Sequence, residues 1–165
     1  MNLSALFPSW LVHIPFGWIV IVILLLILTF DAMRSGAAHA SIIAIASPVS
    51  LLLFSLIPHA FLLGGVVTPL LSSTFVMAGI FLALFIVTFL LTNRMTATFG
   101  GMSGGLMNSF LAGVSGTVAL AITWMQVPAL MTLWNPGSQL HAIFGLPYAF
   151  FWFVGVYVVL AFVRS

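Results

Sequence analysis

Charged residues are almost absent from this chain, and the few that it has stand between long apolar runs. Of its 165 residues, three are arginine, one is aspartate and none is lysine or glutamate. A soluble domain normally has about a quarter of its residues charged, so this chain has almost no means of facing water. We therefore expect it to fold within a lipid bilayer.

Five apolar runs are long enough to cross a bilayer, which takes about 20 mostly apolar residues in a helix. Together they occupy most of the chain and leave no room for a soluble domain. The sequence therefore predicts an all-α integral membrane protein with one membrane-embedded domain, residues 1–165. Its bundle of about five transmembrane helices is expected at about 11–30, 37–57, 73–92, 104–125 and 143–163.

The arginines set the predicted orientation. Arg34, Arg94 and Arg164 follow the first, third and fifth runs, so all three fall on one side of the bilayer. Because cationic loops are retained in the cytoplasm, we expect the N-terminus outside and the C-terminus in the cytoplasm. Asp31 is expected to form a local ion pair with Arg34 at the cytoplasmic interface. The alternative, in which Asp31 carries a proton or a cation, stays open.

The fourth run carries a small residue at every fourth position. Such a glycine-zipper pattern lets two helix backbones approach closely and associate. One interpretation is packing against the second run of the same chain, and the other is self-association or docking of a partner subunit. The small-residue stripe consists of Gly101, Gly105, Ser109, Gly113, Thr117 and Ala121.

The histidines do not predict a metal site. His13, His59 and His141 fall near the outer face under this topology, but their spacing matches no ligand motif. Whether these three share a site stays open. Cysteine is absent, which removes thiolate ligands and thiol catalysis. No cofactor is predicted, and without a basic patch no nucleic-acid binding is expected.

One short motif raises the question of an enzyme. Gly101 to Gly104 reads G-x-S-G, the form found around the nucleophilic serine of rhomboid intramembrane proteases. That chemistry needs a histidine from a later helix beside the serine. His141 falls on the opposite side of the bilayer from Ser103, and His39 precedes it in the chain. The topology therefore disfavours a protease.

Three features follow one another along the chain in a definite order. They are a turn at Met33 to Gly36, a loop at Thr92 to Gly101 and a glycine-rich helix from Gly104 to Gly116. This layout resembles the colicin V production protein family, small inner-membrane proteins of similar length. The likeness covers about residues 15–125. The chain lacks the family's usual charges near the turn and adds a fifth, aromatic-rich helix. The resemblance implies a role in bacteriocin export or envelope maintenance and carries over no catalytic residue.

These features predict a non-enzymatic multi-span protein of a bacterial inner membrane, acting in export or envelope maintenance. The alternative is a small integral subunit of a larger transporter or respiratory complex, whose neighbours supply the chemistry. The expected partners are the lipid bilayer and, through the small-residue stripe, a second copy or a membrane subunit. The residues name neither a transported species nor a ligand.

Overall fold

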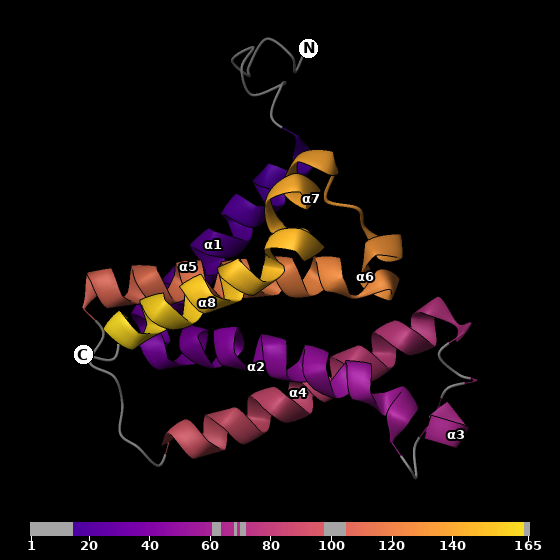
Figure 1. Ribbon diagram of the computed structural model, residues 1–165. Coiled ribbons are helices and arrows are strands. Elements are labelled where there is room, and N and C mark those ends of the chain that lie inside the picture. The colour runs from indigo at the N-terminus through magenta and orange to yellow at the C-terminus, as the bar shows by residue number, and fades with distance from the viewer. Residues whose placement is uncertain (1–14, 61–63, 68, 70–71, 98–104, 164–165) are drawn as a thin grey trace, which may run out of the picture.

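The computed structural model describes residues 15–60, 64–67, 69, 72–97 and 105–163. Within these ranges the chain is helical and has no strand (Figure 1). Five helices are long and apolar enough to cross a membrane, which confirms the predicted all-α class and the predicted number of long apolar helices. They are α1 (Phe16–Ser35), α2 (Ala37–Leu56), α4 (Thr74–Ala97), α5 (Leu106–Gln126) and α8 (Leu146–Val163).

The first helix differs most from its expected bounds. The loop expected at 31–36 is helical up to Ser35, and Gly36 alone connects α1 to α2. Gly36 has φ 91° and ψ 153°, a conformation that is essentially restricted to glycine. The difference has a simple cause: the helix continues beyond the point where its apolar character ends. Asp31 and Arg34 are polar yet remain in its last turns.

Short helices form the connections at the end of the bundle opposite the Gly36 turn. The fifth span begins later than expected, at Leu146, because Gly145 separates it from a preceding short helix. Pro128 opens another at its first position, where a missing backbone N–H costs nothing. These connecting helices are η3 (Ile57–His59), α3 (Gly64–Val67), α6 (Pro128–Leu133) and α7 (Ser138–Phe144).

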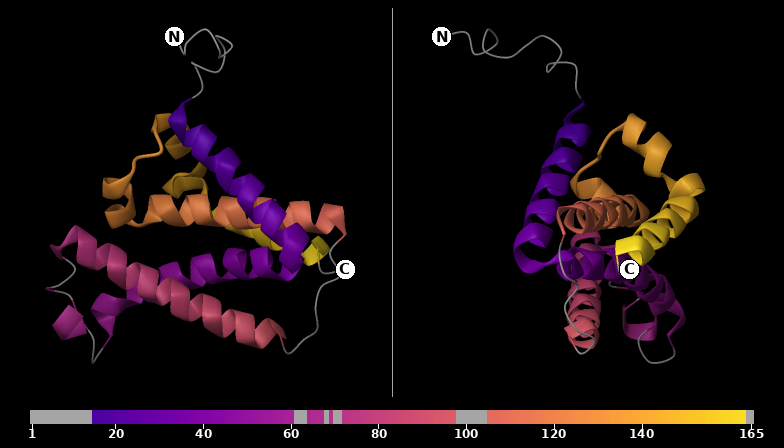
Figure 2. Two further views of the ribbon diagram at one scale, coloured as in Figure 1. Left: turned by 180° about the vertical axis from the view of Figure 1, so that it is seen from behind. Right: turned by 90° about the vertical axis from the view of Figure 1, so that its left-hand side faces the viewer.

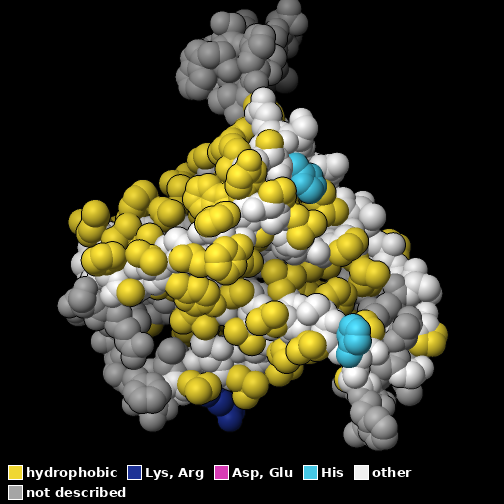
Figure 3. Space-filling model, in the orientation of Figure 1, with side chains coloured by type: hydrophobic (Ala, Val, Ile, Leu, Met, Phe, Trp, Pro, Cys, Tyr) yellow, Lys and Arg dark blue, Asp and Glu magenta, His cyan; other side chains and the backbone are white. Residues whose placement is uncertain are grey.

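Helix α5 is the central element of the bundle. It packs against α1, α2 and α8, whereas α4 lies at the edge and contacts α2 and α6 (Figures 1 and 2). Accordingly 56% of the apolar span of α5 is buried inside the protein, against 11% for α4. On the face shown in Figure 3, hydrophobic side chains cover most of the described surface. This surface suits contact with lipid better than contact with water.

The long helices alternate in direction. The C-terminal ends of α1, α4 and α8 lie at one end of the bundle, together with the N-terminal ends of α2 and α5 (left in Figure 1). Arg34 and Arg94 belong to the last turns of α1 and α4, so they share that end. Arg164 lies outside the described residues.

Candidate functional site

The small-residue stripe faces two helices of the same chain. A Cβ atom added to Gly113 would lie 2.8 Å from the Cα of Thr29 on α1. One added to Gly116, beside the stripe, would lie 3.2 Å from the carbonyl oxygen of Ala40 on α2. Ser109 donates a hydrogen bond of 3.2 Å to the carbonyl of Ala32. The stripe residues Ser109 and Gly113 therefore meet α1, while the neighbouring Gly116 makes the contact with α2.

The remaining stripe residues have different surroundings. Thr117 is buried and bonds the Gly113 carbonyl of its own helix at 2.8 Å. Gly105 is exposed at the start of α5, while Gly101 lies outside the described residues. From Ser109 to Thr117 the stripe is buried inside the chain. Ala121, its last member, lines the apolar groove described below.

The only acidic residue takes a different partner from the one expected. Asp31 Oδ2 lies 2.5 Å from Nδ1 of His39, and Ser35 Oγ donates to Asp31 Oδ1 at 3.2 Å. Arg34, the expected partner, is exposed and is not one of the residues bonded to Asp31. The His39 ring also meets Phe89 of α4 edge-on, with ring centroids 5.3 Å apart. This cluster joins α1, α2 and α4 at the arginine-bearing end.

Sequence reasoning missed the Asp31–His39 pair because it placed a six-residue loop between the two helices. With one connecting residue, the last turn of α1 and the first turn of α2 lie side by side. The signal that could have found the pair was Gly36, the residue type that permits so tight a reversal.

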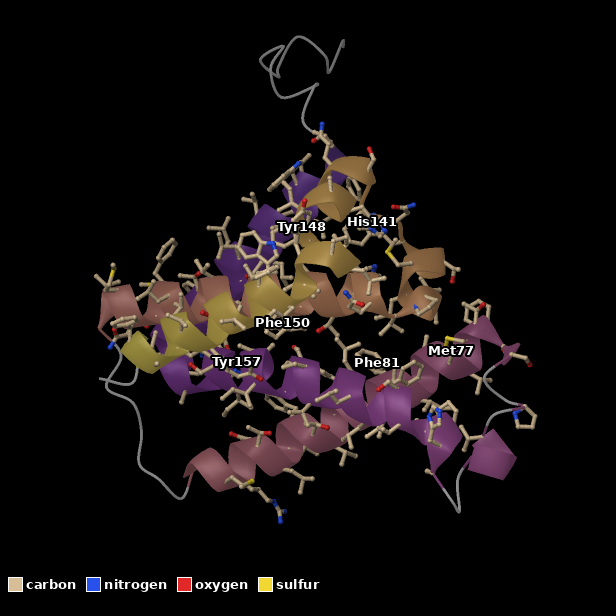
Figure 4. All side chains as sticks on the ribbon, viewed as in Figure 1. Met77, Phe81, His141, Tyr148, Phe150 and Tyr157 are labelled. Atoms are coloured by element: carbon tan, nitrogen blue, oxygen red, sulfur yellow. The ribbon has the colours of Figure 1, made fainter. Side chains whose placement is uncertain are left out.

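The other predicted polar residues do not assemble into a site in the described part of the chain. His59 is exposed in η3, and His141 is exposed on α7 (Figure 4). No group of three potential metal ligands occurs among the described residues. His13 and the motif from Gly101 to Gly104, including Ser103, lie outside them.

An apolar groove of about 630 Å³ offers room for a ligand. It lies among α1, α4, α5 and α6, the elements that face the reader in the left panel of Figure 2. Its volume is within the range of about 300–1,000 Å³ typical of small-molecule sites. It is lined by Val20, Ile21, Leu24, Ala78, Gly79, Phe81, Leu82, Phe85, Leu120, Ala121, Thr123, Trp124, Leu130, Leu133 and Trp134.

The docking of α4 forms one wall of this groove. Phe81 is 4% exposed and packs with Val127 and Ala129 around the start of α6, and Met77 adds to this contact (Figure 4). Phe54 of α2 meets the Phe81 ring edge-on, with centroids 5.7 Å apart. Helix α4 packs on α2 and α6, and α1 packs on α5. The groove lies between α4 on one side and α1 with α5 on the other.

The lining is almost entirely hydrocarbon and aromatic. The indole N–H of Trp124 is already used, because it donates to the Trp134 carbonyl at 3.0 Å. The hydroxyl of Thr123 is buried and has no hydrogen-bond partner within the described part of the chain. The groove therefore suits a long apolar molecule. Sequence reasoning had no signal for this groove, since a leucine facing a ligand looks like a leucine facing lipid.

No protein-family model, curated protein or solved structure matches this chain. The fold places it in a coarser class, that of all-helical proteins with five helices long and apolar enough to span a membrane, and an apolar groove lies among those helices.

Proposed function

We propose that this is a non-enzymatic protein of a bacterial inner membrane that binds a hydrocarbon chain in its lateral groove. The process it serves is export or envelope maintenance, as the resemblance to the colicin V production protein family implies. The observation that carries the proposal is the apolar groove of about 630 Å³ among α1, α4, α5 and α6. No titratable side chain lines that groove, so its chemistry favours binding over catalysis.

A bilayer supplies a molecule that fits this groove. Side chains that face an empty space lose the dispersion contacts that atoms in that space would provide. A lipid chain restores those contacts without desolvating any polar group. Because lipid tails are as apolar as leucine, specificity must come from the shape of the walls. Here two phenylalanines of α4 and two tryptophans supply rigid walls, namely Phe81, Phe85, Trp124 and Trp134.

The proposed orientation places the end with Arg34 and Arg94 in the cytoplasm, since cationic segments are retained there. The natural chain has no cysteine, so single-cysteine variants report their side without background. We expect cysteines at Ser35 and Met95 to be shielded from an impermeant maleimide in intact cells. Those at Ser72 and Asn135 should react. Reaction of Ser35 and Met95 from opposite sides would contradict the five-span topology.

Filling the groove tests the proposed function. Gly79 of α4 lines the groove, and a Cβ atom added there meets nothing within 4 Å. We expect Gly79→Leu to fold normally and to occupy space needed by the ligand. Overpacking of this kind costs about 1–3 kcal/mol, which lowers the affinity of the groove for a hydrocarbon chain about five-fold or more. The measurement is the amount of lipid retained by the purified protein, counted by native mass spectrometry.

Gly155→Leu on α8 is the matched control. It makes the same change at a helical glycine where an added Cβ also meets open space, and Gly155 does not line the groove. This variant should retain lipid as the unsubstituted protein does. Equal retention by both variants would reject the groove as the binding site.

The aromatic face of α8 favours the alternative function, an integral subunit of a larger transporter or respiratory complex. Phe150, Phe151 and Phe162 are each about 70% exposed, near Tyr148 and Tyr157 (Figure 4). Aromatic side chains are enriched where proteins associate. A stoichiometric second polypeptide that co-purifies in mild detergent, and that is lost on Phe150→Ala and Phe151→Ala substitution, would support this alternative.

A further inference from the structure

The apolar groove is confined to one half of the bundle. On α1 its lining reaches no further than Leu24, although the helix continues to Ser35. On α4 the lining ends at Phe85, and on α5 it begins only at Leu120. The lining residues therefore belong to the half of each helix nearer α6, away from the arginine-bearing end.

The oblique course of α4 explains this confinement. Helices α4 and α5 converge toward the α6 end and diverge toward the arginine-bearing end, where α2 lies between them (Figures 1 and 2). Helix α4 packs on α2 and on α6, and α6 is present at one end of the bundle only. Only the first half of α4 therefore stands opposite α1 and α5, and the groove is the space between them.

The extent of the groove along the helices matches a single leaflet. At 1.5 Å per residue, Leu24, Phe85 and Leu120 lie about 12, 16 and 9 Å from the ends of their helices nearer α6. One leaflet contributes about 15 Å to a hydrocarbon core of about 30 Å. A lipid of the opposite leaflet has its headgroup at the other interface, so only the tips of its chains approach this depth.

Aromatic rings lie across the end of the groove nearest the interface. Trp134, which follows α6, meets Phe16 at the start of α1 edge-on, with ring centroids 6.3 Å apart. The Trp134 ring also meets that of Trp124 near the end of α5, with centroids 5.8 Å apart. These rings join α1, α5 and the end of α6, so they hinder entry along the helix axes from water.

The side of the groove is open instead. Phe81 and Ala121 line it and are buried, whereas the lining residues Gly79, Leu82 and Leu133 are exposed. The exposed rim is continuous with the apolar outer surface of α4 and α6. A hydrocarbon chain beside the bundle can therefore enter the groove sideways without passing a polar group.

We propose that the groove draws one chain of a membrane lipid sideways from a single leaflet, the leaflet at the α6 end of the bundle. With the arginine-bearing end in the cytoplasm, this is the leaflet that faces the periplasm. The inference rests on the proposed function, because it requires the groove to bind a hydrocarbon chain. It adds the leaflet that supplies the ligand and the route by which the chain enters.

The test delivers one lipid to one leaflet at a time. Membrane vesicles containing the full-length protein are prepared with either face outward. Reaction of the single-cysteine variants Ser35→Cys and Ser72→Cys with an impermeant maleimide shows which end of the bundle is exposed. The probe is a phosphatidylcholine with a diazirine in one acyl chain, exchanged from cyclodextrin into the outward leaflet in the cold. After photolysis the cross-linked residues are mapped by mass spectrometry.

The half-buried lining residues report occupancy of the groove. When the α6 end faces outward, we expect adducts on Ile21, Leu24 and Leu120. When the arginine-bearing end faces outward, we expect these adducts to be lost. Adducts should then form on Leu90 and Leu91, which are exposed in the second half of α4 and show that the probe was delivered.

Two glycine variants separate the groove from lipid that merely surrounds the protein. Gly79→Leu fills the groove and should lower the adducts on its lining about five-fold or more. Gly155→Leu, the matched control on α8, should leave them unchanged.

The proposed function and the choice of leaflet fail in different ways. Lining adducts that are absent from both preparations, or that persist in Gly79→Leu, would reject the groove as a binding site. Lining adducts that Gly79→Leu removes, but that form equally from both leaflets or only from the arginine-bearing side, would leave the groove standing. Either of those two results would overturn the single-leaflet inference.

Discussion

Replacing Gly113 with leucine is expected to lower the stability of the protein by about 3 kcal/mol, at the upper end of the cost of overpacking. A single Cβ at this position already comes within 2.8 Å of Cα and 2.9 Å of N of Thr29. These are backbone atoms, so rotation of a side chain cannot relieve the overlap. Helices α1 and α5 would have to separate, losing the hydrogen bond from Ser109 to the Ala32 carbonyl as well. The measurement is the thermal unfolding midpoint in mild detergent.

Gly155→Leu provides the control for this substitution too. It introduces the same side chain into another long apolar helix, where no atom lies within 4 Å of the added Cβ. Its unfolding midpoint should stay close to that of the unsubstituted protein. A Gly113→Leu variant as stable as Gly155→Leu would mean that α1 and α5 do not meet at this point. A change confined to the oligomeric state would assign the small-residue stripe to another subunit.

Gly36→Ala is expected to destabilise the protein by about 1–3 kcal/mol through the backbone alone. Gly36 adopts φ 91° and ψ 153°, which a residue with a Cβ atom rarely reaches. A longer or rearranged turn would separate the ends of α1 and α2. The 2.5 Å contact between Asp31 and His39 depends on their closeness, so it would be lost with the turn.

Gly105→Ala is the matched control for the turn. Gly105 precedes α5 with φ −67°, and an added Cβ meets nothing within 4 Å. Alanine there is expected to leave the unfolding midpoint unchanged or to raise it slightly, because it restricts the unfolded chain. Equal stability of Gly36→Ala and Gly105→Ala would show that the left-handed turn at Gly36 is not required.

The amino-acid sequence by itself determined the class of the fold and the number of long helices. Both depend on local quantities, namely how many apolar residues follow one another and where charge interrupts them. The stripe from Ser109 to Thr117 also marked α5 as a helix with close neighbours, because only small side chains permit such contact. Helix ends were less predictable where polar residues continue a helix, as Asp31 and Arg34 do in α1.

Only the tertiary structure decided which residues meet. Apolar side chains look alike in sequence whether they face lipid, another helix or a groove, so neither the edge position of α4 nor the groove could be predicted. Asp31 pairs with His39 because Gly36 alone reverses the direction of the chain between α1 and α2. The unbonded hydroxyl of Thr123 is likewise visible only in space. A carbonyl four residues back is available to every helical threonine, and the surrounding packing decides whether it is used.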